Sequence, residues 1–232
     1  MFASVISAAL VALTSLGVAA QSTSPGTSAA PSADTAKVRV LHASPDAPAV
    51  DVYADGAPIL TDVAFGTISD YLVVPAGEHR IQVFATGADP VADTAVIDAK
   101  LTFAAGTMTT VAATEKLASI KAQVIADAPA PVADKAQIRV VHLSADAPAV
   151  DVAPDGAAPI VSALAYPNAS AYLTVPAAAY DLEVRPAGTM DVALQLDPIT
   201  LDAGSSYSVF AIGSAADGTL TVVSKVDATA AP

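Results

Sequence analysis

Short runs of residues with a hydrophobic period of two recur along most of the chain. Val38, Val40 and His42 fall on one face of an extended segment, whereas Arg39 and Leu41 fall on the other. These runs are separated by Asp-Gly, Pro-Ala-Gly and Ala-Gly turn signals. The sequence has no segment with the period of about 3.6 residues and the paired caps of a helix. The pattern therefore predicts an all-β fold.

The strand pattern occurs twice. Residues 38–57 and 138–157 are identical at fourteen of twenty aligned positions. The similarity continues over two further pairs of segments, 71–83 with 172–184 and 101–113 with 199–211. A repeat of this length matches a whole small sandwich domain rather than a solenoid unit. We therefore expect two tandem antiparallel β-sandwiches of seven or eight strands each.

The other segments have the composition of a leader, linkers and a tail. The first twenty residues are mostly apolar and uncharged. They end in the small residues Val18, Ala19 and Ala20, which a signal-peptidase site requires, although the basic n-region of a signal peptide is missing. Polar interruptions distinguish this run from a membrane anchor. The expected organisation is a signal peptide (1–20), a disordered linker (21–36), β-sandwich domain 1 (37–125), a Pro/Ala hinge (126–136), β-sandwich domain 2 (137–225) and a tail (226–232).

The repeated motif resembles a known family. The segments HASPDAPAVDVYADG at 42–56 and HLSADAPAVDVAPDG at 142–156, each followed by a Leu-x-Val-Pro-Ala strand, are similar to the domain-of-unknown-function family 4397. The second copy departs from the first at Ala145 in place of Pro45 and at Ala153 in place of Tyr53. The resemblance implies export and tandem immunoglobulin-like β-sandwiches, and it brings no established catalytic residues.

Composition excludes several kinds of site and partner. The 232 residues include no Cys, which excludes disulfides, thiolate metal sites and Cys nucleophiles. Ten Lys and Arg against 23 Asp and Glu give a net charge of −13, which argues against nucleic acid as a partner. Few Lys or Glu guard the predicted strand edges, which favours assembly with other proteins. We expect cell-surface or envelope proteins as partners, and no transmembrane segment after signal cleavage.

Each copy carries an acidic loop that could ligate a hard cation. Its aspartates are Asp46, Asp51 and Asp55 in the first copy and Asp146, Asp151 and Asp155 in the second. Their spacing differs from that of the EF-hand loop. Asp51 is expected to point outward from a strand, and Asp55-Gly56 is a turn pair. We expect structural roles, with calcium as the alternative. Hydrolase elbows, paired catalytic Glu residues and phosphate-binding Gly loops are absent from the sequence.

The histidines carry the sharpest chemical hypothesis. The chain has three, His42, His79 and His142, and their parity places all of them at inward-facing strand ends. Imidazole suits Cu(II), and a protein without thiols can bind copper only through His, carboxylate or Tyr. We therefore single out these three residues as a candidate metal site for copper. The alternative is structural imidazoles hydrogen-bonded to a nearby Asp such as Asp46 or Asp146.

Two functions follow from the sequence. The first is an exported cell-envelope or surface protein that acts as a non-catalytic binding or structural module within a surface assembly. The second is a His-ligated copper metalloprotein of the envelope, an oxidoreductase that could dismute superoxide. The lack of a complete catalytic constellation in the sequence favours the first, whereas the inward placement of every His favours the second. The sequence assigns no catalytic residue.

Overall fold

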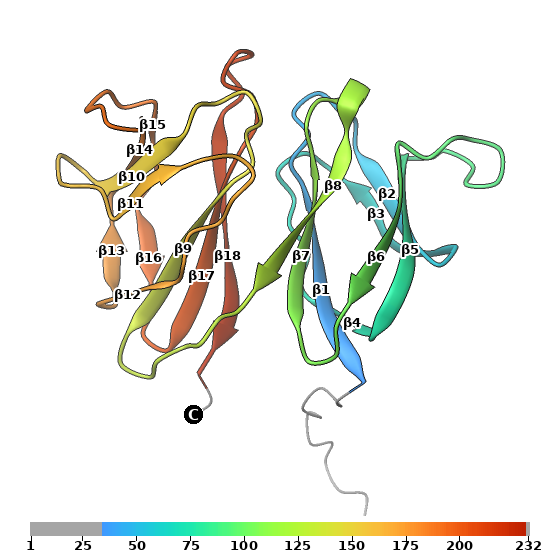
Figure 1. Ribbon diagram of the computed structural model, residues 1–232, viewed down its shortest axis with the longest axis horizontal. Helices are drawn as coiled ribbons and strands as arrows, with labels where there is room; N and C mark the ends of the chain where they lie inside the picture. The colour runs from blue at the N-terminus through green and yellow to red at the C-terminus, as the bar shows by residue number, and fades with distance from the viewer. Residues whose placement is uncertain (1–33, 231–232) are drawn as a thin grey trace, which may run out of the picture. The chain divides into compact units, whose positions relative to one another are not determined.

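The computed structural model describes residues 34–230. The expected signal peptide and nearly all of the expected linker lie outside the described residues. The described residues fall within one compact unit and consist mainly of strands and turns (Figure 1). The one helix among them is the single turn η1 (Leu117–Ser119), and none is long and apolar enough to span a bilayer. The prediction of an all-β fold is confirmed.

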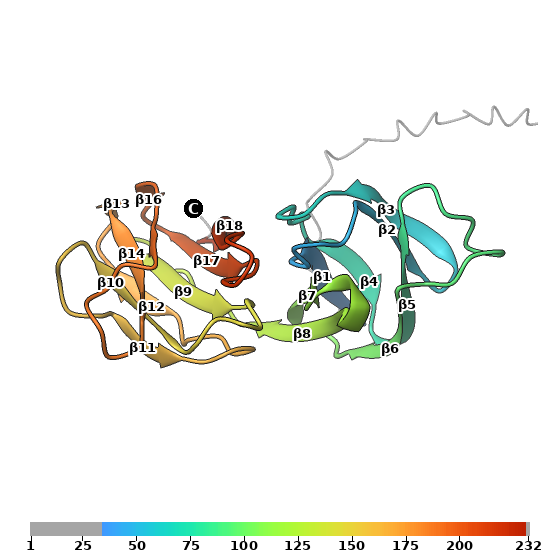
Figure 2. The same cartoon turned by 90° about the horizontal axis from the view of Figure 1, so that it is seen from above.

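The first copy is a sandwich of two four-stranded sheets (Figure 2). One sheet has the order β4-β1-β7-β8 and the other β3-β2-β5-β6. The strands are β1 (Thr35–His42), β2 (Val50–Ala54), β3 (Ala57–Val63), β4 (Leu72–Pro75), β5 (Gly77–Ala85), β6 (Ile97–Phe103), β7 (Met108–Thr114) and β8 (Lys121–Asp127). Their pairs are antiparallel, as predicted, except that β1 and β7 are parallel.

The second copy repeats this topology, again with one parallel pair, β9 with β17. Its main sheets have the orders β12-β9-β17-β18 and β11-β10-β14-β15, and β13 pairs with β16 separately. The strands are β9 (Ala136–His142), β10 (Val150–Pro154), β11 (Val161–Leu164), β12 (Leu173–Val175), β13 (Ala178–Tyr180), β14 (Leu182–Pro186), β15 (Leu194–Gln195), β16 (Ile199–Leu201), β17 (Ser205–Ile212) and β18 (Thr221–Thr229). The prediction of two tandem sandwiches is confirmed, but the described residues of the second copy form ten strands rather than seven or eight, because the counterparts of β5 and β6 are each split in two.

Each copy encloses an apolar core between its two sheets. The first core includes Val40, Val52 and Val83, and the second includes their counterparts Val140, Val152 and Val184. These side chains come from alternate positions of their strands, because successive side chains of a strand point to opposite faces. The hydrophobic period seen in the sequence therefore selects the core residues of both copies.

A third apolar cluster joins the two copies. It contains Leu41, Ala43, Ala112 and Ile125 of the first copy, and Val141, Leu143, Phe210 and Ile212 of the second. All seven residues of β9 and all eight of β17 are buried, so both faces of these strands are covered. The face that Arg39 and Leu41 share, opposite the first core, therefore packs against the second copy instead of facing water.

The strands extend past the expected domain limits. β1 begins at Thr35, within the expected linker, and β8 ends at Asp127, within the expected hinge. At the other end of the chain, β18 continues to Thr229, within the expected tail. Asp127 and Asp227 are both only 6% exposed. The end of β8 and the part of β18 around Asp227 are therefore packed within the structure.

Candidate functional site

The repeated histidines hold a loop of their own copy. His42 Nε2 lies 3.0 Å from the carbonyl oxygen of Pro48, and its Nδ1 lies 3.3 Å from the backbone N–H of Ser44. Because a carbonyl can only accept and an N–H can only donate, Nε2 carries the proton and Nδ1 accepts. His142 makes the same two bonds at the same distances. Neither imidazole therefore offers a free nitrogen lone pair to a metal.

His79 is engaged differently, with acceptors on both sides of its ring. Its Nδ1 lies 2.6 Å from Asp55 Oδ2, and its Nε2 lies 2.9 Å from the carbonyl oxygen of Pro75. The Asp55 carboxylate and the Pro75 carbonyl raise the pKa of His79 above its ordinary value, because both stabilise the doubly protonated ring. The ring also stacks on Phe103, with centroids 5.9 Å apart. With an acceptor at each nitrogen, this ring holds its own copy together rather than offering a ligand to a metal.

The structure does not assemble the predicted three-histidine copper site. Within residues 34–230, no three His, Cys, Asp or Glu side chains form a group that could hold a metal ion, so His42, His79 and His142 do not converge. The expectation of a strand-end imidazole bonded to a nearby Asp holds for His79, whose partner is Asp55, and Asp46 and Asp146 do not take that role. The repeated histidines bond to loop backbone, and the imidazole that pairs with a carboxylate is His79.

The aspartates of the acidic loops accept backbone hydrogen bonds. Asp51 does not point into solvent: it is 8% exposed, and its carboxylate accepts from the N–H groups of Asp62 and Gly87 at 2.8 and 3.2 Å. The pKa of Asp51 is lowered, mainly because its carboxylate accepts from the Asp62 N–H. Burial acts in the opposite direction, and the Gly87 N–H lowers the pKa further. Asp151 binds its two loops in the same manner. These carboxylates fasten loops to strands, as the structural interpretation expects.

Asp46 and Asp146 each fasten a different loop. Asp46 holds the loop after β7, and Asp146 holds the loop after β17. Asp146 accepts hydrogen bonds from the Ser214 hydroxyl and from the N–H groups of Ala215 and Ala216. Burial would raise the pKa of Asp146, but these donors outweigh it and hold the pKa well below its usual range. Asp46 accepts from the Leu117 N–H at 2.7 Å. Both oxygens of Asp146 and Oδ1 of Asp46 are thus occupied by protein donors.

Four buried charges lie between the copies. Arg39 Nη2 lies 2.6 Å from Asp227 Oδ1, and Arg139 pairs with Asp127. The side chains of Arg39, Asp127 and Asp227 are fully buried, and that of Arg139 is 3% exposed. Each arginine therefore pairs with an aspartate of the other copy, and Arg39 Nε also lies 3.7 Å from Asp127 Oδ2 of its own copy. The arrangement is electrically neutral, as a buried group of charges must be to persist without water.

Hydroxyl groups of both copies contribute hydrogen bonds to this network. Tyr71 donates to Asp127 and Tyr172 donates to Asp227, each at 2.7 Å. Burial raises the pKa of both tyrosines well above the usual range, so both remain donors. Thr110 and Ser208 each accept from an arginine Nε and donate to an aspartate. These partners come from strands far apart in the chain, so no local sequence pattern indicates them.

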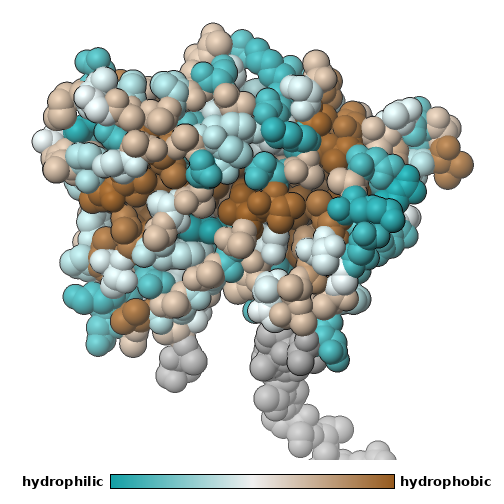
Figure 3. Space-filling model, in the orientation of Figure 1, coloured by the Kyte–Doolittle hydropathy of each residue, from teal (hydrophilic) through white to brown (hydrophobic). Residues whose placement is uncertain are grey.

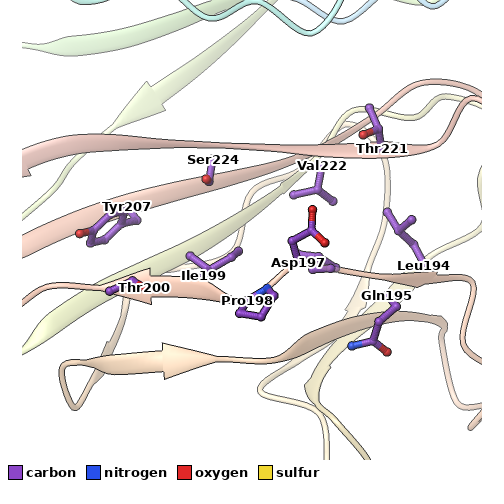
Figure 4. Close-up of a pocket in the computed structure, with 11 residues that line it drawn as sticks. Leu194, Gln195, Asp197, Pro198, Ile199, Thr200, Tyr207, Thr221, Val222 and Ser224 are labelled. Carbon is purple, nitrogen blue, oxygen red and sulfur yellow. The ribbon is translucent and has the colours of Figure 1, made fainter.

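An open groove of about 400 Å³ lies in the second copy (Figure 4). One wall is β18, which contributes Thr221, Val222 and Ser224, and the other is the segment 194–200. Figure 4 shows Asp197 and Ile199 pointing toward β18, with Val222 and Ser224 pointing from β18 toward them. Polar and apolar side chains therefore alternate around an opening that solvent can reach.

The groove exists because one strand of the second copy is interrupted. In the first copy β6 runs for seven residues and lies in contact with β8. The corresponding segment of the second copy is split into β15 and β16, and Pro198 stands where β6 has Lys100. Proline has no N–H to donate and therefore cannot continue a strand ladder. Pro198 was the one sequence signal for this site, and the strand pattern alone did not single it out.

His142 lines a different cavity, of about 220 Å³, in the second copy. The other residues around it are mainly alanine, proline, valine and leucine, and the imidazole nitrogens are already bonded to Pro148 and Ser144. The cavity around the predicted histidine therefore offers little polar chemistry. The groove along β18 presents a carboxylate, an amide and several hydroxyls, and we take it as the candidate binding site.

A family model described as "Domain of unknown function (DUF4397)" matches residues 36–153 and 154–232. No curated protein matches the chain. Among solved structures, the Bacillus anthracis TIE protein is 12% identical with a TM-score of 0.25, over 78% of this chain and 34% of that one. A structure titled "Alpha-glucan binding by a streptococcal virulence factor" is 12% identical with a TM-score of 0.24, over 79% of this chain and 95% of that one. Likeness at this level carries no conclusion about function.

Proposed function

We propose that this chain, which belongs to the DUF4397 family of unknown function, is an exported surface module. It binds another envelope component without catalysis. Export is inferred from the apolar leader at 1–20, with cleavage after Ala20. The groove along β18 in the second copy is the proposed binding site. The first copy and the inter-copy packing serve to hold that site.

The open groove is the observation that carries this proposal. Its lining combines the Asp197 carboxylate, the Gln195 amide and the hydroxyls of Thr221 and Ser224 with apolar side chains such as Ile199. A concave surface with a few polar groups on an apolar background is typical of binding sites. Asp197 and Ser224 are exposed, so their polar atoms can reach a ligand.

The repeated polar residues support a structural rather than a catalytic role for the rest of the molecule. His42 and His142 hold loop carbonyls, and Asp51 holds loop N–H groups. The four charges between the copies neutralise one another. No observation on the described residues favours the copper alternative.

An exposed apolar residue on the edge strand of the groove is further support. Val226 on β18 is 42% exposed. Figure 3 shows apolar side chains gathered in patches among polar ones on the face it displays. Isolated exposed valines are common on protein surfaces, but edge strands that carry them are open to pairing with another chain.

The test compares one substitution in the groove with its counterpart in the first copy. Ser224 and Val124 occupy equivalent positions on β18 and β8, and both are exposed. Labelled protein starting at residue 21 is titrated with isolated envelopes of the cells that produce it. Ser224→Trp fills the groove and should weaken binding by about tenfold or more, whereas Val124→Trp should bind as the unchanged protein does. Equal affinity of all three proteins would refute the groove as the binding site.

A further inference from the structure

The groove lies between the edges of two sheets. β18 is the last strand of the order β12-β9-β17-β18, and β15 is the last strand of the order β11-β10-β14-β15. Within residues 34–230, β18 pairs with β17 and with no other strand. An edge strand presents a row of N–H and C=O groups that have no partner in their own sheet. The unpaired edge of β18, from which Thr221, Val222 and Ser224 line the groove, therefore offers a backbone template along one wall.

The opposite wall cannot serve as such a template. Pro198 interrupts the segment between β15 and β16 and has no N–H, so a chain lying in the groove cannot pair continuously with that side. Its side chains are instead available for contact. Leu194 and Ile199 provide apolar surface there, and Val222 provides it from β18.

The lining also defines the charge of a suitable ligand. Asp197 is the one charged side chain among the lining residues that the structure describes, and it points toward β18. Residues 135–225 of the second copy carry four Lys and Arg against nine Asp and Glu, a net charge of −5. A carboxylate on an acidic background attracts Lys or Arg in a ligand.

We infer that the groove binds an extended, basic segment of a partner protein, which adds as a further strand to the free edge of β18. In an extended chain alternate side chains point to opposite sides. One set therefore contacts the apolar residues of the groove, with a Lys or Arg at Asp197, while the backbone pairs with β18. This is the β-strand addition by which sheet edges bind peptides. The inference rests on the proposed function and specifies its partner.

The first experiment selects random peptides displayed on phage against immobilised protein starting at residue 21. Clones that also bind the Ser224→Trp variant are removed. The selected peptides should alternate apolar and polar residues and contain Lys or Arg. Failure to enrich any peptide over the Ser224→Trp background, or enrichment of acidic peptides, would overturn the inference.

The second experiment measures how the selected peptide binds. Asp197→Asn should weaken its binding by about tenfold, whereas Asp191→Asn, which removes the same charge outside the groove lining, should leave it unchanged. Two versions of the peptide carry N-methyl groups on either the odd-numbered or the even-numbered backbone amides. Methylation removes donors to the β18 edge, so binding should be abolished in one of these two patterns. Binding that is indifferent to Asp197→Asn and to both patterns would contradict strand addition.

The third experiment separates this inference from the proposed function. Envelopes are treated either with trypsin, which removes exposed protein, or with periodate, which oxidises glycans. Loss of groove-dependent binding after trypsin alone supports a protein segment as partner. Loss after periodate alone would leave the proposed function standing and overturn the peptide inference, since the partner would then be a glycan. If Ser224→Trp binds untreated envelopes normally, the proposed function itself fails.

Discussion

Replacing Arg39 by methionine tests the packing between the two copies. The Arg39 and Asp227 side chains are both fully buried and lie 2.6 Å apart. Methionine keeps much of the apolar volume but leaves the Asp227 carboxylate with only the Tyr172 and Ser208 hydroxyls. Removal of one partner from a buried ion pair costs about 3–5 kcal/mol, because the remaining charge is desolvated and uncompensated. That is a large part of the about 5–15 kcal/mol by which most domains are stable.

The assay is urea unfolding followed by far-ultraviolet circular dichroism, with the free energy of unfolding taken from the midpoint and slope. A second variant, Arg39→Met with Asp227→Leu, removes the whole pair and leaves Arg139 with Asp127. It should be less destabilised than Arg39→Met alone, since an apolar pair can replace a buried ion pair at little cost. Arg80→Met, which breaks the exposed pair with Asp98, should cause only a small change. A loss below about 1 kcal/mol for Arg39→Met would refute the buried network.

Two further substitutions test local features. Gly213 has a φ of 94°, and a Cβ there would lie 2.2 Å from the carbonyl oxygen of Thr219. Gly213→Ala should therefore lower the free energy of unfolding by at least about 1–3 kcal/mol in the same urea assay. An unchanged midpoint would contradict the turn geometry. Burial lowers the pKa of His142 below its ordinary 6.5. As the pH drops through 6.5, the unfolded chain therefore takes up the proton before the folded one does, and the contribution of His142 to stability falls. When the pH is lowered from 7.5 to 5.5, the His142→Gln variant should lose less stability than the unchanged protein. His79→Gln should lose more, because the folded pKa of His79 is raised and its protonation adds stability that fades as the pH rises.

The fold could be predicted because it depends on local patterns that the sequence repeats. Alternation at Val38 and Val40 located the first strand and its core face, and the second copy confirmed the same pattern. The covered outer face was not predicted, since alternation cannot tell which of two faces meets another domain. A signal was present, however: Val141, Phe210 and Ile212 make the outer face of their strands apolar as well. Strands buried on both faces lose the clean alternation of half-exposed ones.

The chemistry of the histidines could not be derived from parity. Parity placed His42 and His142 on the inward face; both are buried, and His142 lines a cavity together with the core residues Val150 and Val184. Their partners, however, are the carbonyls of Pro48 and Pro148, and the path of a loop over a strand end depends on tertiary packing. The groove escaped prediction for a similar reason, because Pro198 interrupts a strand whose neighbours are far away in the sequence.

Hydrogen exchange of the bound protein tests the central claim most directly. The protein starting at residue 21 is allowed to exchange alone and with saturating envelopes, and protection is mapped by mass spectrometry. Binding in the groove predicts slower exchange at 194–200 and along β18, with the corresponding strands β6 and β8 of the first copy unchanged. Protection confined to β6 and β8, or spread evenly over both copies, would contradict the assignment of the binding site to the second copy.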